Sequence, residues 1–92
     1  MANYLVRVEL HSANGPDYET LHQKMVAKGF LRTILSRDSL LYKLPTAEYT
    51  VSSSLTVEEV RDHARAAAND TGKNSDVLAV EYLGSAWYLS KA

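Results

Sequence analysis

The first segment of the chain, residues 3–11, alternates between apolar and mostly polar side chains. One set of alternate positions holds Tyr4, Val6, Val8 and Leu10, and the other holds Leu5, Arg7, Glu9 and His11. A period of two residues is typical of a β-strand that turns one face to a hydrophobic core and the other to water. The segment is therefore predicted to be a strand with one apolar face and one largely polar face.

Two later segments have the pattern of capped amphipathic helices. The first helix is expected over residues 16–28, because Pro16 suits the first turn of a helix and Gly29 suits the left-handed position after its end. The second is expected over residues 57–69, because Thr56 and Glu59 have the spacing of a capping box.

Three further segments, 30–36, 46–53 and 76–82, are predicted to be strands. Residues 40–43 could pair back as a short strand, but Pro45 interrupts the pattern, so the third main strand is placed after it. The resulting order predicts one α+β domain over residues 1–92, with the ferredoxin-like βαββαβ arrangement. In it a four-stranded antiparallel sheet has two helices on one face, and its other face is open to a ligand, RNA or a second copy.

Composition removes several classes of function. The chain has 92 residues and no cysteine, which excludes disulfides, cysteine nucleophiles and cysteine-ligated zinc. Ten Lys and Arg residues against eleven Asp and Glu residues give a net charge of −1, so binding of nucleic acid would need a local basic patch. No segment has the apolar length of a signal peptide or a membrane span, so we expect a cytoplasmic protein without membrane insertion.

No phosphate-binding loop, metalloprotease motif or nucleophile elbow occurs in the sequence. What remains is the row formed by Arg7, Glu9 and His11, whose spacing of two places them on one face of the first strand. Cleavage of RNA by its own 2′-hydroxyl needs a base, an acid and a cation, and these three side chains can supply them. The alternative is a solvated strand face on which Arg7 and Glu9 compensate each other.

The remaining histidines and the C-terminal aromatic residues have simpler interpretations. His22 favours a surface or boundary position and His63 a structural role. The histidines lack the spacing that would place two on one helical face, so no metal site is expected. Trp87 and Tyr88 would either plug the end of the sheet or anchor a homodimer, and we favour the plug.

Several segments together resemble a known family: Asn3–Glu9, Gly29–Leu44, Tyr49–Leu55, Glu58–Asp62 and Val80–Tyr88. They span nearly the whole chain, and the family is that of the GhoS antitoxins of type V toxin–antitoxin systems, similar in fold to the small CRISPR-associated adaptation nuclease. The resemblance implies an endoribonuclease that cuts the messenger RNA of a small membrane toxin. It places Glu9 where the CRISPR-associated relatives have an aspartate, and His22 and Lys24 at basic positions of the first helix.

Two hypotheses follow from these observations. The first is a GhoS-like antitoxin that acts as a sequence-selective endoribonuclease on single-stranded toxin messenger RNA, without a metal or a small-molecule cofactor. Its expected catalytic residues are Glu9, His11 and His22, and its expected RNA-binding residues are Arg7, Lys24 and Arg32. The second is a non-catalytic interaction domain that self-associates, or binds a protein partner, through its open sheet face.

Overall fold

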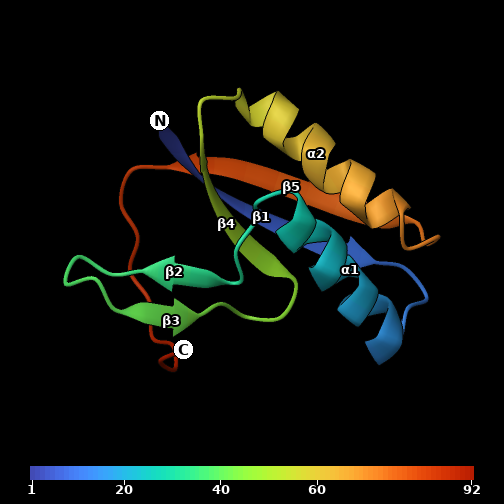
Figure 1. Ribbon diagram of the computed structural model, residues 1–92, viewed down its shortest axis with the longest axis horizontal. Helices are drawn as coiled ribbons and strands as arrows, with labels where there is room; N and C mark the ends of the chain where they lie inside the picture. Colours follow the sequence, from blue (N-terminus) through green and yellow to red (C-terminus); the bar gives the residue numbers. More distant parts are fainter.

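The computed structural model describes residues 1–92, and its helices and strands are shown in Figure 1. The strands are β1 (Ala2–Leu10), β2 (Thr33–Leu35), β3 (Leu41–Lys43), β4 (Glu48–Ser53) and β5 (Ser75–Tyr82). The helices are α1 (Gly15–Ala27) and α2 (Val57–Asn69). Neither helix is long and apolar enough to cross a membrane.

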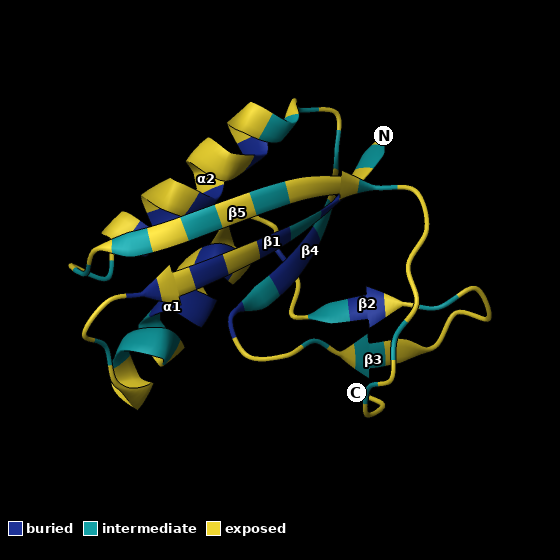
Figure 2. Cartoon of the chain, turned by 180° about the vertical axis from the view of Figure 1, so that it is seen from behind, coloured by how far each residue is buried: buried dark blue, intermediate teal, exposed yellow.

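Strand β1 is the central strand of a three-stranded sheet with the order β4-β1-β5. It pairs antiparallel with both neighbours, so that Arg7 lies opposite Glu48 on one side and Leu78 on the other. The predicted alternation is confirmed, because the apolar set of β1 is buried: Tyr4, Val6, Val8 and Leu10. Both helices cover this apolar face and leave the other face of the sheet open, as the two opposite views show (Figures 1 and 2).

The helix boundaries follow from local capping interactions. The capping box of α2 is confirmed, since the backbone N–H of Glu59 donates to the Thr56 hydroxyl and the backbone N–H of Thr56 donates to the Glu59 carboxylate. Helix α1 has a second capping box between Asn14 and Asp17, which the sequence analysis overlooked. Gly29 has the expected left-handed conformation, with φ of +92°.

The predicted ferredoxin-like sheet is wrong. The chain is α+β with two helices, but its strands form a three-stranded sheet and a separate two-stranded sheet, β2-β3, instead of a single four-stranded sheet. The element order also differs from βαββαβ, because residues 41–43 form an extra strand that pairs with β2. The segment predicted as a strand over 30–36 supplies only three residues to that hairpin.

Contacts around Thr50 explain why the second strand leaves the main sheet. Leu31 forms a single bridge to Thr50, with both backbone N–H···O distances at 2.8 Å. The Thr50 hydroxyl then donates to the carbonyl oxygen of Thr33 at 2.6 Å, which occupies an acceptor that a continued ladder would need. Ile34, which pairs with Tyr42 in the short hairpin, is buried. A local run of strand-forming residues does not reveal which neighbour they pair with.

The C-terminal tail continues the hairpin on the free side of β3. The backbone N–H of Lys43 donates to the carbonyl of Ser90, and the N–H of Ala92 donates to the carbonyl of Leu41. Trp87 is half-buried, and its ring packs on Tyr42 with a centroid distance of 5.6 Å. The predicted plug role is wrong for Tyr88, which is fully exposed.

One polar pair is buried between α1 and β4. His22 is 6% exposed, and its Nδ1 atom is hydrogen-bonded to the Tyr49 hydroxyl at 2.6 Å. Burial lowers the pKa of His22, and the nearby charge of Arg32 lowers it further, against an opposing effect of Glu19. Burial also raises the pKa of Tyr49 to about 12, so its hydroxyl stays protonated at neutral pH.

We expect Thr56→Ala to destabilise the protein by about 1 kcal/mol, because the substitution removes the hydroxyl that accepts from the backbone N–H of Glu59. This N–H has no partner within the first turn of α2 without it. Urea unfolding measures the change as a lower midpoint. Ser54→Ala, which removes an exposed hydroxyl just before the cap, is the control and should leave the midpoint unchanged. Equal midpoints for the wild type and Thr56→Ala would contradict the assignment of the cap.

We expect the His22–Tyr49 pair to make stability depend on pH. Because the folded state lowers the pKa of His22, the unfolded chain takes up a proton first as the pH falls below the ordinary histidine value of 6.5. The stabilisation is therefore present above that value and is lost as the pH falls through the lower folded-state pKa. Urea midpoints should drop more between about pH 7.5 and pH 5.5 for the wild type than for His22→Asn, which cannot be protonated in this range. Parallel pH profiles would refute this linkage.

Candidate active site on the open sheet face

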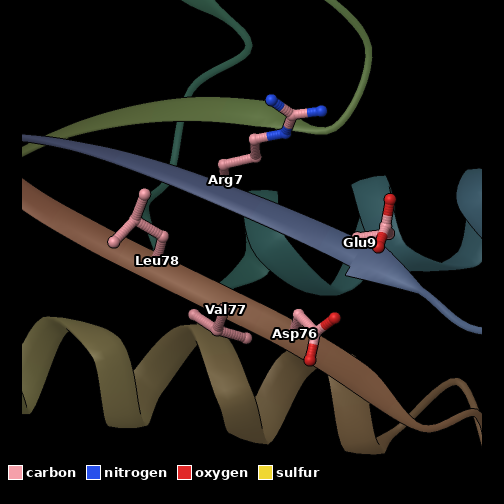
Figure 3. Close-up of a pocket in the computed structure, with 5 residues that line it drawn as sticks. All are labelled: Arg7, Glu9, Asp76, Val77 and Leu78. Carbon is pink, nitrogen blue, oxygen red and sulfur yellow. The ribbon is translucent and has the colours of Figure 1, made fainter.

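The site begins with side chains of β1 that point away from the helices. Arg7 and Glu9 are exposed on the open face, and Glu9 lies opposite Asp76 of β5. Arg7, Glu9, Asp76, Val77 and Leu78 line a shallow pocket of about 210 Å³ (Figure 3). The pocket therefore combines a cation and two carboxylates at the end of β1 where the strand enters its turn.

His11 completes the site from the turn that follows β1. Its backbone N–H donates to the carbonyl of Asn74 at 2.8 Å, which holds the turn against the start of β5. Its Nε2 atom lies 2.9 Å from a carboxylate oxygen of Asp76. Nitrogen or oxygen atoms of Glu9, His11 and Asp76 all lie within 4.8 Å of one another. We call these three residues the carboxylate–histidine cluster.

The charges of this site suit a proton-transfer reaction on an anion. The two carboxylates alone would repel a phosphate, and Arg7 supplies a positive charge on the same face of the sheet. The guanidinium of Arg7 is exposed and takes part in none of the ion pairs of the chain, which join His11 to Asp76, Arg61 to Asp62 and Lys73 to Asp17. It is therefore available to a phosphate group from solution.

The carboxylate–histidine cluster is also the one group of side chains placed to hold a metal ion. It offers one imidazole nitrogen and two carboxylates, a donor set that suits a divalent cation. The histidine spacing predicted no metal site, because spacing reports only on residues close together in the sequence. Here the ligands come from β1, its following turn and β5, which the sheet brings together.

The structure does not bring the other predicted site residues to this cluster. His22 lies in the core on the helix-covered side of the sheet, bonded to Tyr49. Lys24 is exposed on α1, on that same side. Arg32 is exposed just before β2, close enough to His22 to lower its pKa. Arg7, Glu9 and His11 are thus together, and His22, Lys24 and Arg32 are elsewhere.

Asp76 joins the site although the sequence pattern indicates only that it lies at the start of the last strand. In an antiparallel pair the start of one strand lies beside the end of the other. Pairing the last strand with the first would therefore have placed Asp76 beside Glu9 and His11, as the register shows.

One comparison with known proteins relates the sequence to a family. The model of a family described as "Endoribonuclease GhoS" matches residues 1–83. That range includes both helices, all five strands and the whole carboxylate–histidine cluster. No curated protein matches the sequence.

Proposed function

We propose that this chain, which belongs to the GhoS endoribonuclease family, cleaves single-stranded RNA at the carboxylate–histidine cluster of its open sheet face. The observation that supports the proposal most is the 2.9 Å contact between His11 and Asp76 beside Glu9. It places an imidazole that can donate and accept protons next to a second proton acceptor, on a surface open to a polymer.

In this mechanism the RNA supplies its own nucleophile. Glu9 accepts the proton of a 2′-hydroxyl, and the 2′-oxygen forms a bond to the adjacent phosphorus. The bond from phosphorus to the 5′-oxygen breaks, and protonated His11 gives its proton to that oxygen. The products are a 2′,3′-cyclic phosphate and a 5′-hydroxyl, so no water or redox partner is consumed.

The neighbouring groups support each step. The Asp76 carboxylate, 2.9 Å from Nε2 of His11, orients the His11 ring. Arg7 stands two residues before Glu9 on the same face, about 7 Å along the strand. From there it can neutralise the negative charge that develops on the phosphate oxygens.

The finer part of the proposal concerns the substrate and its biological role. We propose that the RNA is the messenger of a toxin and that its cleavage makes this protein an antitoxin. The support is membership of the GhoS family, and the charge of −1 is consistent with a selective enzyme more than with a general RNA-binding protein.

A non-catalytic interaction domain remains the competing hypothesis. It is favoured by aliphatic side chains of β5 that are exposed on the open face, where Leu78 is 62% and Val80 is 39% exposed. Such side chains could contact a protein partner or a second copy. The two hypotheses differ in whether the purified protein cuts RNA.

We expect Glu9→Gln and His11→Ala each to lower the rate of RNA cleavage by roughly 100-fold or more, because each removes a proton-transfer group. Asp76→Asn should lower it less, since that residue acts through His11. Binding of RNA should change little in all three variants. The measurement is the rate at which labelled single-stranded RNA is cut, with detection of the cyclic phosphate end.

The controls are His63→Ala and Glu81→Gln, which alter an exposed histidine of α2 and an exposed glutamate of β5 away from the cluster. The endoribonuclease hypothesis would be rejected in favour of the interaction-domain hypothesis if the wild type cut no RNA. The same conclusion would follow if the site variants were as active as these controls. Parallel reactions contain EDTA or added Mg²⁺. Loss of cleavage in EDTA with recovery in Mg²⁺ would contradict the metal-free mechanism and assign the cluster to a metal ion.

We expect Arg7→Ala to weaken RNA binding and to reduce the slope of log affinity against log salt concentration by up to about one unit, because one phosphate contact is lost. Affinity is measured at several salt concentrations with RNA that carries 2′-O-methyl groups, which cannot be cut by the proposed route. Arg65→Ala removes another exposed arginine, from α2, and should leave the slope unchanged. Equal slopes for the two variants would show that Arg7 does not contact phosphate.

A further inference from the structure

A second and larger hollow lies on the same sheet face, at the opposite end of β1 from Glu9. It is a groove of about 490 Å³ between the beginning of β1, the β2-β3 hairpin and the C-terminal tail. Figure 2 shows the tail descending from β5 beside that hairpin. The groove is lined by Asn3, Arg37, Ser52, Tyr82 and Trp87 among other residues, and we call it the hairpin groove.

Two polar side chains of neighbouring strands form one wall of the hairpin groove. Asn3 and Ser52 are paired across β1 and β4, and both are exposed. The Ser52 hydroxyl donates to Oδ1 of Asn3 at 2.6 Å, which fixes the orientation of the amide. The amide nitrogen of Asn3 keeps its two donors, and Oδ1 keeps a second lone pair. This combination of donor and acceptor matches the edge of a nucleobase.

An aromatic ring is held in place at the same groove. Trp87 contacts Tyr42 on one side, with ring centroids 5.6 Å apart, and is still partly exposed. Tyr82, the cross-strand neighbour of Asn3, adds a second ring to the lining. Unpaired bases stack on such side chains, whereas the bases of a duplex are already stacked and paired.

Charge and position connect the hairpin groove to the proposed active site. Arg37, in the turn between β2 and β3, is exposed and free of ion pairs, so it can bind a phosphate. Asn3 and Glu9 are on the same face of β1, about 20 Å apart along the strand. A single-stranded nucleic acid lying along the open face would reach both.

We propose that the hairpin groove binds an unpaired base of the RNA, a few nucleotides from the phosphate that is cut, and so selects where cleavage occurs. The inference rests on the proposed endoribonuclease function, and it assigns to Asn3 the recognition of a base edge, to Trp87 its stacking and to Arg37 the adjoining phosphate.

Trp87 is the single tryptophan of the chain, so its fluorescence reports on the groove directly. We expect single-stranded RNA with 2′-O-methyl groups to quench this fluorescence with saturation, because the base stacks on the ring. Asn3→Ala and Arg37→Ala should each weaken the binding roughly tenfold, the loss expected for one good base or phosphate contact. The matched controls are Asn69→Ala and Arg65→Ala, which change the same residue types on the exposed side of α2 and should bind as the wild type does. Urea midpoints of all variants confirm that each remains folded.

A second measurement maps cleavage positions on a mixed-sequence RNA. Asn3→Ala should shift or broaden the set of positions that are cut, and Asn69→Ala should not. Cleavage with an unchanged map and unquenched Trp87 would overturn the role of the groove and leave the endoribonuclease intact. Quenching that depends on Asn3 and Arg37 in a protein that cuts no RNA would support the groove and overturn the endoribonuclease. If RNA does not quench the Trp87 fluorescence at any salt concentration, the proposal is overturned. A segment of a protein partner would then be the remaining candidate ligand of the hairpin groove.

Discussion

Strand β1 is hydrogen-bonded along both edges, to β4 on one side and to β5 on the other, and every other feature of the protein depends on that placement. Its side chains alternate strictly, so the same residues that bury Val6 and Val8 under the helices force Arg7 and Glu9 onto the opposite face. A shift of the strand by one residue would bury two charges. The core therefore fixes the position of the proposed active site.

The carboxylate–histidine cluster shows how a small sheet assembles a site from distant residues. Glu9 lies next to the last residue of β1, and His11 follows in the turn. Asp76, the second residue of β5, lies more than sixty residues later in the chain and is 2.9 Å from His11. Because all three are exposed, they contribute little to stability and are free to serve a ligand. Paired strands hold Glu9 and Asp76, and the hydrogen bond from His11 N–H to the Asn74 carbonyl holds the turn, which favours a reaction that needs fixed proton-transfer groups.

The β2-β3 hairpin and the C-terminal tail add a second surface that a plain four-stranded sheet would not have. Their departure from the main sheet begins at the hydrogen bond from Thr50 to Thr33. The tail then pairs with β3 and brings Trp87 against Tyr42. Both the hairpin groove and its aromatic wall result from these pairings between segments far apart in the chain.

The sequence by itself determined the local structure: the faces of β1 through alternation, the start of α2 through Thr56 and Glu59, and the end of α1 through Gly29. These features depend on neighbours only a few residues away. Three of the four residues of the proposed site, Arg7, Glu9 and His11, were predictable for the same reason. Only the tertiary structure decided that Asp76 meets His11, that His22 turns into the core, and that the second strand leaves the main sheet. Each of these contacts depends on which distant strand lies beside the segment. Backbone hydrogen bonds are the same for every residue type, so the choice of the neighbouring strand leaves no local pattern in the sequence.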